Sequence, residues 1–231
     1  MAQTLLISGT DTEIGKTVVT SALLSYWQSY RRHESIAVCK PLQAGPGDRE
    51  LYANLFQLQQ PPDSVNPLYY EQPLAPPLAA ERSGKTIDLL PAWMTLQRLQ
   101  AQFDWVLVEG LGSLGSPVTH ESTIADLARD WRLPILLVVP IRLGCIGQVI
   151  AYVALARQSQ LDIKGIILNS AWALTAEEIQ KWAPVTMIES LTQVPVLGIV
   201  PHLDDPTNLE QLAQVTSQLD LEALGSLTYA I

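Results

Sequence analysis

The segment Gly9–Thr17 ends in Gly-Lys-Thr, follows a short apolar run and leads into a stretch that can form a helix. Such a strand-to-helix turn gathers backbone N–H groups at a helix N-terminus, where the helix dipole favours an anion. Gly15 allows the backbone to approach phosphate oxygens, Lys16 can reach the β- and γ-phosphates of a nucleotide, and the Thr17 hydroxyl can bind Mg²⁺. The segment is a variant of the phosphate-binding loop, because Thr10 stands where the strict pattern has glycine.

Position 11 separates this loop from a related one. ATPases of the chromosome-partitioning type carry a second lysine four residues before the glycine of the Gly-Lys pair, and here that position is Asp11. The sequence therefore disfavours an ATPase that works through that intermolecular lysine.

Two carboxylates and two cations could complete a magnesium-nucleotide site. Glu109 ends an apolar run, and Asp48 follows Gly-Pro-Gly at the start of a predicted helix. Carboxylate oxygens are ligands that Mg²⁺ prefers, although Asp48 fits a plain helix N-cap equally well and Glu109 could be a surface carboxylate. Lys40 and Arg142 follow other apolar runs, and each could stabilise a transferring phosphoryl group or be a solvated strand-end side chain.

These side chains need a scaffold that brings distant segments to one edge. Short runs that are apolar on both faces alternate with stretches that can form helices, which predicts an α/β fold: a doubly wound, mostly parallel sheet with helices on both faces, like that of P-loop NTPases. The carboxyl ends of its strands share the edge where such sheets bind ligands. The predicted strands are Leu5–Ser8, Ile36–Lys40, Trp105–Glu109, Ile135–Val139, Gly165–Asn169 and Val196–Val200, and the predicted helices are Lys16–Tyr30, Arg49–Leu58, Leu89–Gln102, Thr123–Trp131, Gly147–Gln160, Thr175–Lys181 and Asn208–Leu219.

The segment 60–91 interrupts this alternation with closely spaced prolines. Their density excludes a long helix or a central strand. The segment is either a surface linker or a long ordered loop over a ligand cleft.

Composition and charge limit the partners. The chain has 231 residues, 48% of them hydrophobic and 16% charged, which suits one domain over residues 1–231. Its 14 Lys and Arg against 23 Asp and Glu give a formal charge of -9, which disfavours nucleic acid and anionic membranes. No apolar run approaches the roughly 20 residues of a membrane helix. The chain shows no secretion signal, and its two cysteines suggest neither a disulfide framework nor a metal site, so we expect a cytoplasmic protein.

Several segments together resemble the dethiobiotin synthetase family over nearly the whole chain. Gly9–Thr17 is similar to the GTDTxVGKT loop of that family, which is far more specific than a generic phosphate-binding loop. The other matching segments are Cys39–Gly45 (a lysine-proline segment), Glu109–Gly112 (an acidic-glycine segment), Leu143–Ile146 (an LGCI turn), Asn169 (an asparagine that reads the base) and Pro195–Pro201 (the strand before an adenine-contacting loop).

The resemblance implies a ligase of biotin biosynthesis. In the family, 7,8-diaminononanoate reacts with CO₂ to form a carbamate, ATP phosphorylates the carbamate, and the second amine closes the ureido ring, giving dethiobiotin, ADP and phosphate. The resemblance also implies Mg²⁺ as cofactor, and a homodimer in which the LGCI segment of one subunit completes the active site of the other.

Roles carry over from the resemblance residue by residue. Lys16 and Lys40 would neutralise charge on the transferring phosphoryl group, with Lys40 also facing the carbamate, and Thr17, Asp48 and Glu109 would hold Mg²⁺. The ATP-binding residues would be Glu13, Ile14, Gly15, Lys16, Thr17, Val18, Asp48, Glu109, Gly110, Leu111, Gly112, Asn169, Ser170, Pro201, His202 and Leu203, and the substrate-binding residues Ala44, Leu143, Gly144, Cys145 and Ile146.

A few positions depart from the family pattern. Ala44 stands where Ser or Thr is common, Gly147 where an asparagine follows the LGCI turn, and Arg142 where a lysine precedes it. These positions concern contacts with the substrate and leave the ATP and Mg²⁺ residues intact. A nucleotide-dependent sensor derived from the family would explain the first two. A cobyrinate-type amide ligase shares the fold but usually carries a fused glutaminase domain, for which this chain has no room.

Overall fold

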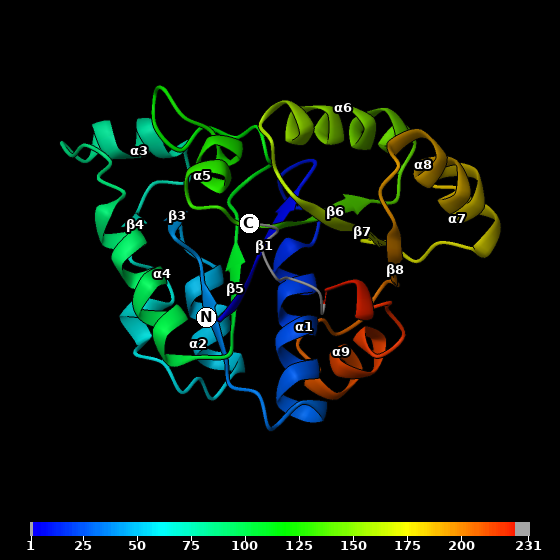
Figure 1. Cartoon of the computed structure of the whole chain (residues 1–231), viewed down its shortest axis with the longest axis horizontal. Helices are drawn as coiled ribbons and strands as arrows, with labels where there is room; N and C mark the ends of the chain where they lie inside the picture. The colour runs from blue at the N-terminus through cyan, green and yellow to red at the C-terminus, as the bar shows by residue number, and fades with distance from the viewer. Residues whose placement is uncertain (1, 225–231) are drawn as a thin grey trace.

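The computed structural model in Figure 1 describes residues 2–224, so Met1 and residues 225–231 of the predicted domain 1–231 lie outside the described residues. A six-stranded sheet runs through it, and every strand pairs with its neighbours in parallel. The predicted parallel α/β sheet is confirmed. Its strands are, in spatial order, β2 (Ile36–Cys39), β5 (Trp105–Glu109), β1 (Gln3–Gly9), β6 (Ile135–Pro140), β7 (Ile163–Asn169) and β8 (Val196–Val200).

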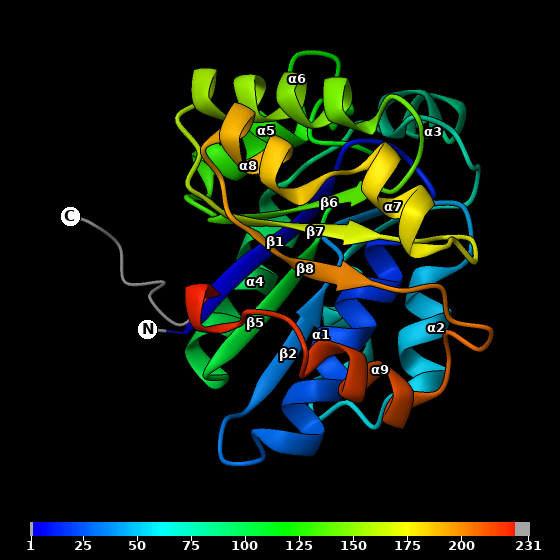
Figure 2. The same cartoon turned by 90° about the vertical axis from the view of Figure 1, so that its right-hand side faces the viewer.

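Helices cover both faces of the sheet (Figure 2), with one apolar cluster on one face and two on the other. On one face lie α1 (Lys16–Tyr30), α2 (Asp48–Leu55) and α9 (Leu209–Thr216); on the other lie α3 (Pro76–Arg82), α4 (Leu90–Gln102), α5 (Ile124–Asp130), α6 (Cys145–Gln158), α7 (Ala176–Trp182) and α8 (Val185–Thr192). Among the described helices, none combines the length and apolarity that crossing a membrane requires.

The strands are apolar throughout because both of their faces are buried. In β1, Leu5 and Ile7 pack in the cluster beside α1, whereas Leu6 packs in the cluster on the opposite face. Side chains alternate between the two faces of a strand, so a strand covered on both sides needs apolar residues at successive positions.

Strand register brings the candidate chemistry to one edge. In β5, Glu109 pairs with Ile7 of β1, and Val108 pairs with Cys39 of β2. The phosphate-binding loop follows β1, and Lys40 follows β2 directly. Three adjacent parallel strands therefore deliver the loop, the carboxylate and the lysine to neighbouring positions at their carboxyl ends.

The proline-rich segment contains more regular structure than its composition suggests. It includes a 3₁₀ turn (Pro62–Ser64), the strand β4 (Leu68–Tyr70), which pairs with β3 (Leu42–Ala44) in a separate two-stranded sheet, and α3. Two prolines occupy the first turn of α3, where a missing N–H costs no helical hydrogen bond. The prolines thus start a short helix, while the prediction that no long helix or central strand forms here is confirmed.

Three other predictions need correction. The helix α8 was not predicted, although Pro184 marks its start. The predicted helix Gly147–Gln160 spans Cys145–Gln158. It begins earlier than predicted because Gly144, in a left-handed conformation, is its N-cap. The predicted helix Arg49–Leu58 spans Asp48–Leu55, and its N-cap is Gly47, so the interpretation of Asp48 as the N-cap is wrong. A second 3₁₀ turn, Glu222–Leu224, follows α9.

Candidate active site

The turn between β1 and α1 has the backbone shape of a phosphate-binding loop. Gly15 is the N-cap of α1 with a φ of 90°, a left-handed conformation that glycine adopts without strain. A Cβ atom at this position would lie 2.1 Å from Nδ2 of Asn169. That amide is buried and donates a hydrogen bond of 2.8 Å to the carbonyl oxygen of Ile14. Asn169, at the end of β7, therefore packs against the loop and holds its backbone in place through this hydrogen bond.

Lys16, the residue after Gly15, has little access to solvent. The residue is 7% exposed, and its Nζ donates a hydrogen bond of 2.9 Å to the carbonyl oxygen of Asp11. Burial lowers the pKa of Lys16 from 10.5 to about 8, although the nearby carboxylate of Glu109 acts in the opposite direction. The ammonium is thus poorly compensated, which is a suitable condition for receiving a phosphate anion.

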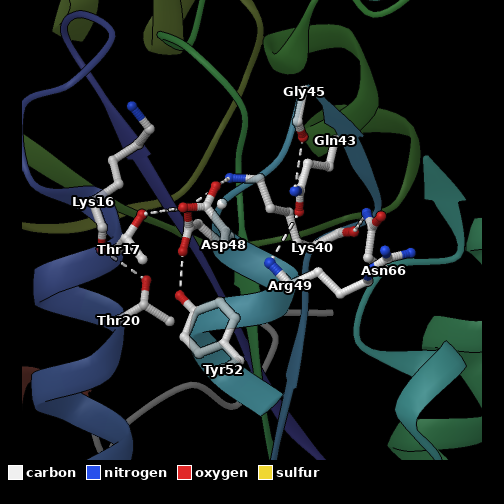
Figure 3. A network of polar contacts seen from close by, with 12 residues as sticks. Lys16, Thr17, Thr20, Lys40, Gln43, Gly45, Asp48, Arg49, Tyr52 and Asn66 are labelled. Atoms are coloured by element: carbon white, nitrogen blue, oxygen red, sulfur yellow. Dashed lines mark hydrogen bonds and ion pairs between the residues drawn. The ribbon is translucent and has the colours of Figure 1, made fainter. Parts of the chain in front are cut away.

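Thr17, Asp48 and Glu109 converge although they come from α1, α2 and β5. Figure 3 shows the Thr17 hydroxyl and the Asp48 carboxylate turned toward each other. The Thr17 hydroxyl oxygen lies 3.0 Å from Oδ1 of Asp48 and 3.0 Å from Oε1 of Glu109. One hydroxyl proton can serve only one of these acceptors at a time. Three oxygen-bearing side chains therefore surround a small volume that favours positive charge.

Lys40 supplies positive charge to this group. Its Nζ donates a 2.8 Å hydrogen bond to Oε1 of Glu109 and also contacts Oδ2 of Asp48. Burial disfavours the ammonium, but the attraction of the Glu109 and Asp48 carboxylates outweighs burial and raises the pKa of Lys40. Lys40 consequently stays charged where a phosphoryl group beside the loop would need a cation.

The loop after β3 places Asp48 in the group. Gln43 accepts a hydrogen bond of 3.1 Å from the backbone N–H of Arg49 and donates one of 2.9 Å to the carbonyl oxygen of Gly45. Behind Lys40, the Asn66 amide donates a 2.7 Å hydrogen bond to the Lys40 carbonyl oxygen. The sequence interpretation missed both positioning residues, because a glutamine and an asparagine in a loop carry no distinctive pattern.

A second residue of α2 also reaches the carboxylates. Tyr52 is fully buried, and its hydroxyl donates a hydrogen bond to Oε2 of Glu109. Burial is the main cause that raises the pKa of Tyr52 well above its ordinary value, and repulsion between a phenolate and the Glu109 carboxylate is the second. The phenol therefore keeps its proton and acts as a donor.

A cavity of about 590 Å³ is lined by the charged and hydroxyl side chains of this group, Lys16, Thr17, Lys40, Asp48 and Glu109. One wall is Ala44 and the loop after it, another is the proline-rich segment at 73–76, and the third is the glycine-containing turn after Glu109. Of the two interpretations of the proline-rich segment, the structure supports an ordered loop over a cleft. The lining residues are Thr12–Thr17, Lys40, Gln43–Pro46, Asp48, Pro73–Pro76, Glu109, Leu111, Gly112, Ser116 and Pro117.

The donor set suits Mg²⁺ better than a softer metal. Its side-chain oxygens are one hydroxyl and two carboxylates, the hard ligands that Mg²⁺ selects. Within residues 2–224, no cluster of three or more His, Cys, Asp and Glu side chains could hold a metal alone. Mg²⁺ typically takes one or two carboxylates and completes its shell with water and substrate phosphates, so the residues present fit the ion.

Other predicted site residues lie farther along the same edge. Ser170 is buried, and its hydroxyl donates to the carbonyl oxygen of Trp172 at 2.6 Å. In the loop after β8, His202 is exposed and Leu203 packs into the cluster beside α1. Gly110, the first residue after β5, lies against the Ile7 carbonyl oxygen. The ATP-binding roles predicted for these residues, for Glu13 and Val18, and for the other positions named from the resemblance all stay predictions.

The LGCI segment lies outside the cavity lining. Leu143 is 83% exposed, whereas Cys145 is buried with its thiol 3.2 Å from the Trp182 carbonyl oxygen. Arg142 turns toward the phosphate-binding loop, where its guanidinium pairs with Asp11 at 2.7 Å. Arg142 therefore contacts the phosphate-binding loop through Asp11, and its role as a cation for a transferring phosphoryl group, one of the two interpretations from the sequence, stays a prediction.

Solved structures of low sequence identity share this fold. MinD of Pyrococcus horikoshii, in its complex with Mg-ADP, has a TM-score of 0.58 and 16% identity, with all of both chains covered. A ParA family ATPase of Chlorobium tepidum has a TM-score of 0.56 and 12% identity, with 98% of this chain and 99% of that chain covered. At such identities the likeness shows the fold alone.

Relatives of much higher identity cover nearly the whole chain. A family model described as an AAA domain matches residues 3–210. The ATP-dependent dethiobiotin synthetase BioD of Crocosphaera subtropica is 53% identical over 221 residues, which are 96% of this chain and 99% of that protein. The protein of the same name from Gloeothece citriformis is 50% identical over 95% of this chain and 97% of its own length, and that from Bacillus thuringiensis is 33% identical over 86% and 83%. With this identity and coverage, the chain belongs to the family of ATP-dependent dethiobiotin synthetases.

Proposed function

We propose that this enzyme uses ATP and Mg²⁺ to carboxylate 7,8-diaminononanoate with CO₂ and close the ureido ring, giving dethiobiotin, ADP and phosphate. The observation that carries the proposal is the convergence of Thr17, Asp48, Glu109 and Lys40 beside a phosphate-binding loop and a cavity. This convergence occurs in a chain that is about half identical to synthetases of that name over nearly all of its length.

The reaction divides into three steps whose atoms balance. A neutral amine of the substrate attacks CO₂ and loses a proton, which gives a carbamate. A carbamate oxygen then attacks the γ-phosphorus, and the bond from that phosphorus to the bridging oxygen of ADP breaks. The second amine, also neutral, finally attacks the carbamoyl carbon and loses a proton, phosphate leaves with the former carbamate oxygen, and the ring closes.

The charged side chains of the site act on the second and third steps. Lys16 would hold the β- and γ-phosphate oxygens, and Lys40 would lie between the carbamate and the transferring phosphoryl group. Both lysines are buried cations, and a preorganised charge in a water-poor site is worth far more than the same charge in water. Thr17, Asp48 and Glu109 would hold Mg²⁺, which supplies positive charge to the phosphate oxygens.

Part of the cavity wall is apolar and could contact the aliphatic chain of the substrate. Ala44, Pro73 and Leu74 line it, so methylene groups would contact apolar surface there. The Leu143–Ile146 segment lies outside this lining. We propose that the protein is a homodimer and that this segment of one subunit binds the carboxylate of the substrate in the active site of the other. Helix α6 begins at Cys145 and presents backbone N–H groups at its N-terminus, the kind of site that favours a carboxylate.

The product assay tests the proposal directly. Protein with ATP, Mg²⁺, bicarbonate and the diamine is expected to form dethiobiotin with one ADP per product, and omission of any component should abolish the product. Mass spectrometry of the product and a coupled ADP assay measure the two quantities. Slow ATP hydrolysis that the diamine does not change, without dethiobiotin, would instead support the nucleotide-dependent sensor.

The lowered pKa of Lys16 predicts how nucleotide binding depends on pH. In the free protein the Lys16 ammonium loses its proton around pH 8, whereas bound phosphate would stabilise the charged form. Nucleotide binding between pH 8 and 9 should therefore take up a proton, and the affinity should fall as the pH rises above 8. Calorimetry in buffers of different ionisation enthalpy measures the uptake, and equal heats in all buffers across this range would contradict the prediction.

A further inference from the structure

The Glu109 carboxylate uses its two oxygens differently. Oε1 faces the Thr17 hydroxyl at 3.0 Å and the Lys40 ammonium at 2.8 Å, on the side where the metal and phosphates would lie. Oε2 is turned away from that side and accepts a hydrogen bond from the Tyr52 hydroxyl. The carboxylate is 1% exposed and the tyrosine is fully buried, so water has little access to replace this donor.

The same short helix carries both Asp48 and Tyr52. They are four residues apart in α2, a spacing that places two side chains on one helix face. Figure 3 shows the Tyr52 ring reaching up to the group that contains Thr17, Asp48 and Lys40. Docking of α2 therefore delivers one predicted metal ligand, Asp48, together with the donor that contacts the other, Glu109.

Packing fixes the ring of Tyr52 against the core. It belongs to the apolar cluster between α1, α2 and the sheet, and its centroid lies 6.3 Å from that of Phe56 at an angle of 36°. A fully buried ring packed in this way has little freedom to follow Glu109 if that carboxylate rotates. The carboxylate must instead adopt the rotation that the phenol allows, and this rotation presents Oε1 to Thr17 and Lys40.

We propose that Tyr52 is a positioning residue of the metal site, whose hydroxyl holds Glu109 with Oε1 directed at the Mg²⁺ that accompanies ATP. The inference rests on the proposed function only for the identity of the metal and the nucleotide. Groups that orient a metal ligand from behind typically contribute 10- to 100-fold to metal affinity or activity. Tyr52 touches no reacting atom in this arrangement and acts through Glu109.

The test is Tyr52→Phe, which removes the hydroxyl and keeps the ring. Mn²⁺ binding in the presence of ADP, followed by electron paramagnetic resonance, reports the metal site without the carboxylation reaction. We expect the Mn²⁺ Kd to rise about tenfold or more, and the Mg²⁺ concentration for half-maximal activity to rise in parallel, with a smaller loss of kcat at saturating Mg²⁺. Tyr70→Phe is the matched control, because Tyr70 is also buried but packs in the cluster on the opposite face of the sheet; it should bind Mn²⁺ like the wild type.

A double-mutant cycle separates positioning from a general structural effect. If Tyr52 acts through Glu109, Tyr52→Phe should change Mn²⁺ affinity little in a Glu109→Gln background, where the ligand is already impaired. A Mn²⁺ Kd within twofold of wild type for Tyr52→Phe, or equal losses in both backgrounds, would overturn the inference. Misfolding of Tyr52→Phe that Glu109→Gln relieves would support it, and misfolding in both backgrounds would overturn it. Normal Mn²⁺ binding by a wild type that forms no dethiobiotin would refute the proposed function while leaving the role of Tyr52 intact.

Discussion

Lys40→Met is expected to lower kcat for dethiobiotin formation at least about a hundredfold while changing the nucleotide Kd only a few-fold. A preorganised donor at a developing charge typically contributes about 10²–10³ in kcat, and the buried Lys40 ammonium lies 2.8 Å from Glu109 at the edge of the cavity. Methionine keeps the apolar stem and removes the charge. Single-turnover kinetics and calorimetry with ATP measure the two effects separately.

Loss of Lys40 should also have a structural signature. Without its ammonium, the carboxylates of Glu109 and Asp48 share a buried region with no cation between them. Breaking a fully buried ion pair costs about 3–5 kcal/mol, and the cost here should be smaller because Asp48 is partly exposed. Mg²⁺ with nucleotide should restore much of the lost thermal stability. Lys181→Met, which removes an exposed lysine paired with Glu177, is the control and should leave kcat unchanged. An unchanged kcat in Lys40→Met would refute the role given to Lys40.

The parts of the site that could be predicted are those that a short continuous segment of sequence determines. The phosphate-binding loop is one continuous segment, Glu109 ends an apolar strand and Lys40 directly follows one, so a parallel sheet brings them to one edge without knowledge of the strand order. Asp48 was ambiguous because an acidic residue after Gly-Pro-Gly fits an N-cap equally well. The structure resolves this point, since Gly47 takes the cap and Asp48 turns toward Thr17.

The parts that could not be predicted depend on contacts between segments far apart in the chain. The three-residue strands β3 and β4 exist because they pair with each other across the 23 residues from 45 to 67, and no local pattern reveals this pairing. Tyr52 looks like an ordinary core aromatic in the sequence. Only the tertiary structure shows that its hydroxyl meets the carboxylate of Glu109, which ends a strand that begins more than fifty residues later.

Lys16→Met should abolish most turnover by another route, weakening ATP binding as well as the chemical step. A lysine in this loop contacts the β- and γ-phosphates before and during transfer, so its loss affects the ground state and the transition state together. We expect the nucleotide Kd to rise well over tenfold, in contrast to Lys40→Met, and kcat to fall at least about a hundredfold. Equilibrium binding of a fluorescent nucleotide, with Lys181→Met as the control, measures the first effect.

The two lysine variants should differ most clearly in the stability of the ligand-free protein. The Glu109 and Asp48 carboxylates raise the pKa of Lys40, whereas burial lowers that of Lys16 to about 8. Below pH 8, Lys16 is charged in both the folded and the unfolded chain, so the folded state bears the full cost of burying its charge. That cost declines between pH 8 and 10.5 as the folded state loses the proton first. Lys16→Met should therefore stabilise the ligand-free fold at pH 7, by about 1–3 kcal/mol, and this gain should shrink toward zero by pH 10.5. Chemical unfolding of both variants at pH 7 and pH 10 checks the opposite signs, and destabilisation by Lys16→Met at pH 7 would show that the hydrogen bond to Asp11 outweighs the burial of the charge.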